Sequence, residues 1–151
     1  GKWDFGTLSR TAWIDQSVLG PPIGAGSNQY IYQHETSTDA DGQPMSSNFR
    51  TGYFAMDEAD VKVFVDQVWP DMKWGYYGGV QNANVQLTFY VTDYPGDTPI
   101  AYGPFTLTQT QQFVTPRFRG RLMAVQISSN DIGSFWRLGN MRYRFQPDGK
   151  Y

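Results

Sequence analysis

Hydrophobic and polar residues alternate along much of the chain. Valines hold the odd positions of residues 61–66, and apolar residues hold the odd positions of residues 85–91, with Gln86, Thr88 and Tyr90 between them. Neighbouring side chains of a β-strand point to opposite faces, so a period of two predicts strands that bury one face. We therefore expect half-buried strands over both ranges.

Turn signals separate such strands at short intervals. The chain has 16 Gly and 9 Pro, which leaves no room for a long helix because both residues interrupt helical runs. Short strands with frequent turns predict an all-β fold, an antiparallel β-sandwich of the jelly-roll-like kind. The expected turns are Gly20-Pro21-Pro22, Asp41-Gly42, Tyr94-Pro95-Gly96-Asp97, Gly103-Pro104, Asn130-Asp131-Ile132-Gly133 and Pro147-Asp148-Gly149.

The beginning of the chain has a different texture. Short aromatic strands, such as residues 30–35, alternate with Gly, Ser and Pro connections, which is typical of a propeller blade or of an arm that enters a sandwich. The polar, small-residue stretch 36–47 predicts a boundary. We expect residues 1–44 to form an N-terminal β arm or the last blade of a propeller, and residues 45–151 to form the antiparallel β-sandwich.

The C-terminal third predicts a β-hairpin rich in arginine. Between residues 117 and 121 the arginines hold odd positions, yet the odd-numbered Met123, Val125 and Ile127 should face the core. One strand cannot do both without a change of parity, so we expect β-bulges at Gly120 and, for the same reason, at Gly139. The six arginines are Arg117, Arg119, Arg121, Arg137, Arg142 and Arg144.

Three roles compete for these arginines: contacts with phosphates, pairing with carboxylates, and a solvated ladder across the hairpin. The formal net charge of −2 and the pI of about 5.2 disfavour a general affinity for nucleic-acid backbones. The 14 Asp and Glu residues supply acidic partners within the chain or on a neighbouring subunit. We favour pairing of both kinds, which makes all six arginines candidates for an assembly interface.

Aromatic residues suggest a second kind of contact. Trp69, Trp74, Tyr76 and Tyr77 lie around Pro70 and Gly75, where a strand should break into a loop. Exposed rings at such a place would stack on the faces of sugars or anchor a partner, whereas buried rings would close the end of the sandwich. A carbohydrate-binding β-sandwich module is therefore the alternative hypothesis.

No catalytic set is evident in the sequence. The chain lacks cysteine and has no Gly-x-Ser-x-Gly, phosphate-binding glycine loop or zinc signature. His34 is the single histidine, and the adjacent Glu35 should point to the opposite face of a strand. Spacing cannot show whether any two carboxylates lie the roughly 5–9.5 Å apart that glycoside hydrolysis needs. We predict a protein that is not an enzyme, with no cofactor.

The segment Asp39-Ala40-Asp41-Gly42 resembles the opening of a calcium loop but lacks the later glutamate, which favours a turn. A calcium ion that joins loops of the sandwich stays an open alternative, although no metal site is predicted. No apolar run approaches the roughly 20 residues that span a bilayer. The chain begins at Gly1, which suggests a fragment or a processed product of a longer protein.

Several short motifs together resemble the C-terminal region of tailed-bacteriophage virion proteins. These are tail hub, nozzle or DNA-stabilisation proteins, in which a β-propeller is followed by a β-sandwich. The resemblance rests on Trp13-Ile14-Asp15, Tyr30-Ile31-Tyr32-Gln33-His34-Glu35, Asp41-Gly42, Arg117-x-Arg119-Gly120-Arg121, Gly133-x-x-Trp136-Arg137-Leu138-Gly139 and Pro147-Asp148-Gly149-Lys150.

The resemblance implies a structural role in a virion that is assembled in the host cytoplasm. The partners would be other virion subunits, in a homo-oligomeric ring of the full-length protein that closes or lines a DNA exit channel, where DNA would make transient contact. Neither catalytic residues nor a membrane contact is implied. Proteins of that family are several times longer, so this chain would hold at most a last blade and the sandwich.

Overall fold

A computed structural model describes residues 9–18, 20–58, 61–76 and 84–150. These residues form antiparallel strands and no helix, which confirms the predicted all-β fold. The chain divides into two compact units, Gly1–Thr38 and Asp39–Tyr151. The division precedes the expected boundary after residue 44, because a small hairpin of β4 (Asp39–Ala40) and β5 (Gln43–Pro44) belongs to the second unit.

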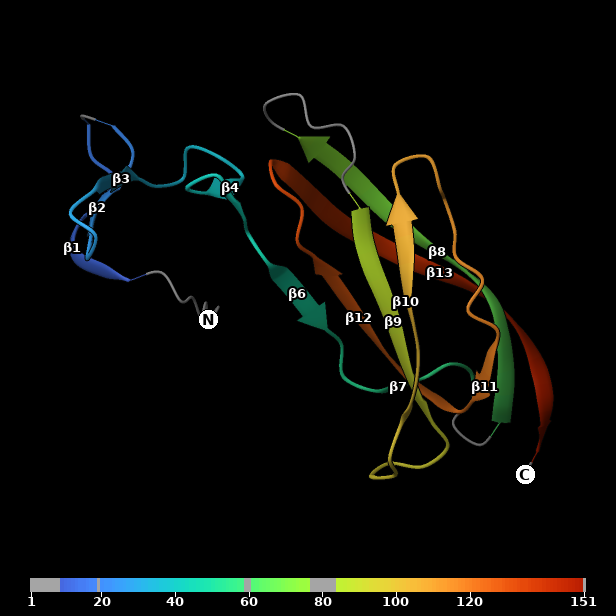
Figure 1. The fold of residues 1–151 in the computed structure, drawn as a ribbon. Helices are drawn as coiled ribbons and strands as arrows, with labels where there is room; N and C mark the ends of the chain where they lie inside the picture. Colours follow the sequence, from blue (N-terminus) through green and yellow to red (C-terminus); the bar gives the residue numbers. More distant parts are fainter. Residues whose placement is uncertain (1–8, 19, 59–60, 77–83, 151) are drawn as a thin grey trace. The chain divides into compact units, whose positions relative to one another are not determined.

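The N-terminal unit is a three-stranded antiparallel sheet in the order β1-β2-β3 (Figure 1). Its strands are β1 (Arg10–Ile14), β2 (Ile23–Gly26) and β3 (Ile31–Gln33). One face carries a polar and aromatic cluster, in which Arg10 Nε donates to His34 Nε2 at 2.9 Å and the His34 ring lies 4.6 Å from the ring of Trp13. Gly24 makes room for this cluster, because a Cβ there would lie 2.9 Å from Arg10 and 3.0 Å from His34.

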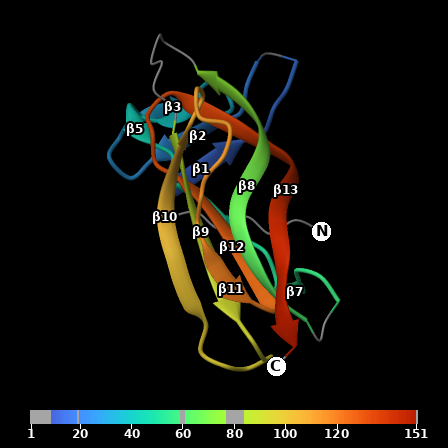
Figure 2. The same cartoon turned by 90° about the vertical axis from the view of Figure 1, so that its right-hand side faces the viewer.

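The C-terminal unit is a β-sandwich of two sheets, which can be followed in Figures 1 and 2. The first sheet has the order β10-β9-β12-β6, and β7 also pairs with β12; the second has the order β11-β8-β13. The strands of the first are β6 (Ser47–Arg50), β7 (Phe54–Ala55), β9 (Asn84–Thr92), β10 (Ile100–Thr108) and β12 (Leu122–Ser129). Those of the second are β8 (Val61–Tyr76), β11 (Phe118–Gly120) and β13 (Ser134–Lys150).

The hydrophobic core lies between these two sheets. In β9 every second side chain is buried, as the alternation of residues 85–91 predicts. The Phe118 ring, from the opposite sheet, is 1% exposed and lies 5.4 Å from the ring of Phe89. Met72, Trp74, Trp136 and Leu138 pack against the core but are only partly buried. The side chains of the core are therefore most completely buried near β11 and less completely buried near Met72 and Trp74 of β8.

The predicted arginine hairpin is wrong. Strand β12 lies in one sheet, whereas β11 and β13 lie in the other and pair with the two edges of β8. The cause is the length of β8, which has 16 residues and accepts both strands as neighbours. Segments that are adjacent in sequence are therefore separated between two layers.

The change of parity near Gly120 has a different origin from the bulge that the sequence suggests. The pairing of β11 with β8 runs through Gly120 without a register shift, and the chain then leaves this sheet for β12. At the crossing, Arg121 N donates to the Thr92 carbonyl at 3.3 Å. A Cβ on Gly120 would overlap Val91 Cγ1, so only glycine fits where the chain passes between the sheets.

Around Gly139, by contrast, the register of β13 against β8 does shift. Leu138 lies opposite Met72 and Met141 lies opposite Pro70, so two residues of β13 oppose the single residue Asp71. This β-bulge keeps Leu138 and Met141 on the core side although their numbers differ in parity. The missing side chain of Gly139 also leaves room for the Asp71 carboxylate, since a Cβ there would lie 3.1 Å from Asp71 Oδ2.

Candidate functional site

Strands β8 and β13 pair along their length and form a two-stranded ribbon. The other edge of β8 is paired in one half of the ribbon, residues 61–68, which we call the closed half, and has no partner among the described residues in the other, residues 69–76, which we call the open half. Along the closed half, β11 covers the second edge of β8 at residues 63–65. Val68 and Val114 then exchange two backbone hydrogen bonds of 3.0 Å, the last contact of this kind on that edge among the described residues. Beyond this bridge, in the open half, the connection from β10 to β11 leaves the edge of β8.

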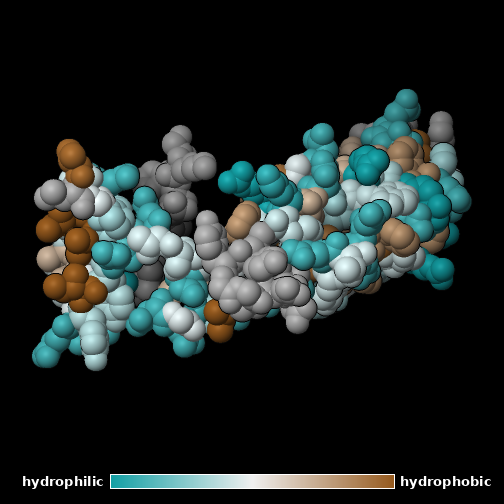
Figure 3. Space-filling model, turned by 90° about the horizontal axis from the view of Figure 1, so that it is seen from above, coloured by the Kyte–Doolittle hydropathy of each residue, from teal (hydrophilic) through white to brown (hydrophobic). Residues whose placement is uncertain are grey.

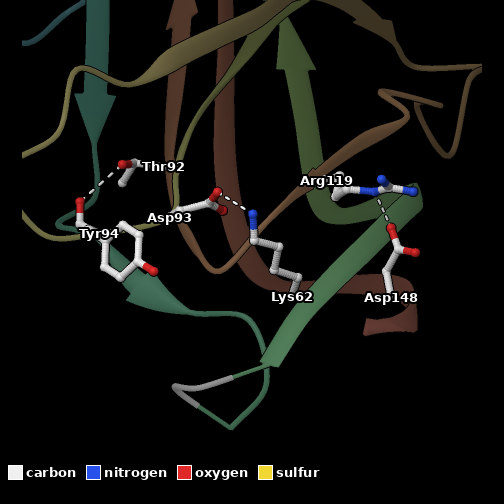
Figure 4. Close-up of polar contacts among 6 residues, drawn as sticks. All are labelled: Lys62, Thr92, Asp93, Tyr94, Arg119 and Asp148. Atoms are coloured by element: carbon white, nitrogen blue, oxygen red, sulfur yellow. Dashed lines mark hydrogen bonds and ion pairs between the residues drawn. The ribbon is translucent and has the colours of Figure 1, made fainter. Parts of the chain in front are cut away.

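Ion pairs tie the closed half together. Arg119 of β11 pairs with Asp148 near the end of β13, so this contact links both neighbours of β8 (Figure 4). Lys62 Nζ donates to Asp93 Oδ2 at 2.5 Å and connects β8 with the end of β9 in the other sheet. The same end is fixed by Thr92 Oγ1, which donates to the Tyr94 carbonyl at 3.0 Å. These contacts connect neighbouring strands and therefore have a structural role.

Arg144 makes a two-pronged contact with Asp66. Its Nε donates to Oδ1 at 2.8 Å and its Nη2 donates to Oδ2. Asp66 is the extra residue of a second register shift, because Arg144 lies opposite Gln67 and Phe145 lies opposite Val65. The hydrogen bonds from Arg144 lower the pKa of the Asp66 carboxyl, and Arg117 adds a smaller effect in the same direction on this pKa.

The remaining arginines of the crossing also have local roles. The Arg121 guanidinium lies over the ring of Tyr94, with 5.2 Å between Cζ and the ring centroid. Arg117 is exposed and adopts a positive φ of 48°, which turns the chain into β11. Of the six predicted interface arginines, Arg119, Arg121 and Arg144 therefore have partners within the chain.

Arg137 and Arg142 differ from these, since neither has a partner among the described side chains. Both are exposed on β13 in the open half of the ribbon. Arg137 lies directly opposite the exposed Lys73 of β8, and like charges in such a cross-strand pair repel each other. Arg142 lies opposite Trp69. The open half thus displays cations that no described side chain neutralises.

A pocket of about 290 Å³ lies beside this open half. It forms where the β10–β11 connection moves away from β8 beyond the Val68–Val114 bridge. Residues from three elements line it: Trp69, Pro70, Asp71, Met72 and Trp74 of β8, Leu107, Gln109, Gln111 and Gln112 of β10 and its connection, and Arg142 of β13.

The predicted aromatic contact residues divide at this pocket. Trp69 and Trp74 both line it, and the Trp69 ring lies 5.9 Å from the ring of Phe113. Trp74 also packs on the core, opposite Trp136, so it closes the sandwich on one side and faces the pocket on the other. Tyr76 is the last residue of β8 and pairs with Ser134, and Tyr77 lies outside the described residues.

The glutamines of the pocket are functional candidates that the sequence pattern did not reveal. The only local signal is the polar run Thr108-Gln109-Thr110-Gln111-Gln112 after a β-strand, which reads as an ordinary loop. Gln111 Nε2 donates to the Phe113 carbonyl at 3.0 Å, which fixes the orientation of the amide. The long-range Val68–Val114 bridge places this run beside the tryptophans, and no local pattern encodes that bridge.

The other residues considered as candidates lie in side-chain clusters or turns. His34 belongs to the cluster with Arg10 and Trp13. Asp41 and Gly42 have φ values of 55° and 70° and connect β4 to β5 as a two-residue turn. Within the described ranges no three His, Asp or Glu side chains gather as metal ligands, and no helix there is long and apolar enough to span a membrane.

Comparisons with known proteins leave the family open. No protein-family model matches the chain, and no curated protein matches it either.

Proposed function

We propose that the chain is a structural module of a tailed-bacteriophage virion, which acts in tail or connector assembly through contacts between subunits. The motifs that resemble phage virion proteins support this role. One structural observation carries it further: the N-terminal sheet has an apolar face on which no described residue of the hydrophobic core packs.

The strand register defines this face. Ala12 lies opposite Ala25, which lies opposite Ile31, and Ile14 lies opposite Ile23. Directly paired residues and those two positions away share one face of a sheet, so all five side chains point the same way. Ile14 is 66% exposed and Ile31 is 76% exposed. Figure 3 shows hydrophobic side chains gathered on the surface of this unit.

A surface that covers this face would remove its apolar side chains from water. Among the described residues, every buried side chain of the hydrophobic core belongs to the C-terminal unit. An exposed apolar patch of this kind marks an interaction site. The occupant that we propose is a second copy of the chain, as expected for neighbours in a ring.

Charges on the C-terminal unit fit the same arrangement. The like-charged pair of Arg137 and Lys73 is exposed. Asp57 and Glu58 are exposed at another place of the same unit and have no ion-pair partner among the described residues. Two different patches of opposite sign can meet between successive copies in a head-to-tail ring. DNA in the channel would be a transient partner of the assembled ring.

Sedimentation velocity over a range of concentrations tests the proposal. The full chain should associate with itself, and the double variant Ile14→Ser and Ile31→Ser should shift the association to at least roughly tenfold higher concentration because it removes apolar contact area. Ile100→Ser is the matched control, since Ile100 is 62% exposed on β10 of the other unit. A chain that stays monomeric at every concentration, or equal effects of both variants, would contradict the proposal.

A further inference from the structure

We infer that the pocket beside the open half of the ribbon binds a neutral pyranose ring of a glycan. This function is separate from assembly, because the pocket belongs to the C-terminal unit and the apolar face belongs to the N-terminal sheet.

The size of the pocket fits a single sugar ring. Its volume of about 290 Å³ lies at the lower end of the range of small-molecule sites. Two of its walls come from paired strands, since Trp69 of β8 lies directly opposite Arg142 of β13. The third wall is anchored by Val114, which is hydrogen-bonded to Val68 at the start of the pocket. The walls are thus held in place without a ligand.

Aromatic rings supply the apolar part of the recognition. The C–H face of a pyranose stacks on an indole because it covers the ring without losing a hydrogen bond. Trp69 is half-buried and its ring packs against Phe113 at 5.9 Å, while Trp74 packs against the core. Both side chains are therefore restrained before a ligand arrives, which lowers the entropic cost of binding.

Polar groups supply the rest, and they are available. Asp71, Gln109, Gln112 and Arg142 line the pocket, and none of their side chains makes a hydrogen bond or ion pair with another described residue. A carboxylate accepts hydrogen bonds from two neighbouring hydroxyls, whereas a guanidinium and amides donate to hydroxyl oxygens. Acceptors and donors at one place match the hydroxyls of a neutral sugar, each of which donates and accepts.

The charges of the lining balance each other. The single acidic residue, Asp71, and the single basic residue, Arg142, give the pocket no net charge, so a uronic acid or single-stranded DNA gains no net attraction from the lining. A purely apolar ligand would leave the Asp71 carboxylate and the Arg142 guanidinium without partners on desolvation. A neutral saccharide satisfies all of these groups.

The test is titration of the full chain with neutral oligosaccharides built from glucose, galactose and N-acetylglucosamine, with an oligouronate and a single-stranded DNA oligomer alongside. Tryptophan fluorescence and calorimetry report binding. At least one neutral oligosaccharide should bind saturably, and Asp71→Ala should weaken it by about tenfold or more because charge-assisted hydrogen bonds are lost. Asp71 is exposed, so its substitution should leave the midpoint of unfolding unchanged.

Two further variants complete the test. Trp69→Ala should abolish binding. The control is Trp13→Ala, which removes a tryptophan that is 50% exposed in the other unit; this variant should bind the saccharide as the parent chain does. The double variant Ile14→Ser and Ile31→Ser should also keep saccharide binding, so failure of assembly and failure of this inference give different results. Absence of neutral-saccharide binding up to millimolar concentration, preferential binding of the oligouronate or DNA, or binding that survives both Asp71→Ala and Trp69→Ala would overturn the inference.

Discussion

The two halves of the β8–β13 ribbon use the same kinds of side chain for different purposes. In the closed half, β11 covers the edge of β8, and Arg119 and Arg144 pair with Asp148 and Asp66. In the open half, no described strand covers that edge, and Arg137 and Arg142 have no partner among the described side chains. A residue type alone therefore says little about function.

The difference teaches that strand coverage decides the role of an arginine in this fold. Where three strands lie side by side, outward-facing arginines reach carboxylates on the neighbouring strands, as Arg119 does across β8. Where the ribbon has only two described strands, it carries a pocket and exposed arginines that have no partner among the described side chains. Stability should accordingly reside in the closed half, and binding should reside in the open half.

The largest expected contrast concerns the core beneath each half. Phe118→Ala removes a ring that is 1% exposed, and it should lower the free energy of unfolding by about 3–5 kcal/mol. Met72→Ala, in the half-buried distal part, should cost about 1–2.5 kcal/mol, because a smaller fraction of its side chain leaves water on folding. Urea denaturation measures both losses, and equal losses would break the comparison.

Gly120 tests the crossing between the sheets. Gly120→Ala should lower the free energy of unfolding by about 1–3 kcal/mol, since its methyl group would overlap Val91 in a packed core. The control is Gly52→Ala, where no atom lies within 4 Å of the new Cβ and the effect should stay within about 0.5 kcal/mol. If Gly120→Ala proved as harmless as the control, the crossing would not be the tight contact described.

Much of the fold follows from local patterns. Alternation in residues 85–91 predicts β9 and its buried face, and the parity conflict near Gly139 points to the interval in which the register of β13 shifts. The parity conflict near Gly120 has the same signature, yet it arises from a change of sheet. Parity shows that a strand changes face and cannot distinguish a bulge from a crossing.

The pairing partners and the pocket could not be predicted in this way. The hairpin prediction assumed that consecutive strands pair, whereas the long β8 separates β11 from β13 and takes both as neighbours. The pocket depends on the contact of Val68 with Val114, which are far apart in the sequence. Trp69 and Trp74 are identifiable from composition and position, but the glutamines that face them are not.

Tyr143 gives a smaller effect that also sets a pH dependence. Its hydroxyl donates to the Met56 carbonyl at 2.8 Å and so ties β13 to the segment after β7. Burial raises the pKa of Tyr143, and the charge of Asp57 raises this pKa further. Above about pH 10 the unfolded chain therefore loses this proton before the folded chain does, and stability falls as pH rises through that window.

Tyr143→Phe should lower the free energy of unfolding at pH 7 by about 0.5–1.5 kcal/mol through loss of the hydrogen bond. The same variant should flatten the alkaline loss of stability, because the group that titrates is gone. Urea denaturation between pH 7 and pH 11 measures both effects, and an unchanged alkaline slope would show that Tyr143 does not cause it.

The central claim is that some arginines stabilise the fold whereas others are left for binding. Arg144→Ala and Arg142→Ala, at two positions on the same face of β13, test it most directly. Both variants are compared by urea denaturation at low ionic strength between pH 7 and pH 2. Arg144 lowers the pKa of Asp66, so this pair stabilises the fold above the ordinary carboxyl pKa, and the contribution disappears as pH falls through the lowered value. Arg144→Ala should therefore reduce stability at pH 7 and weaken its acid dependence, whereas Arg142→Ala should change neither. Equal effects of the two substitutions would contradict the account.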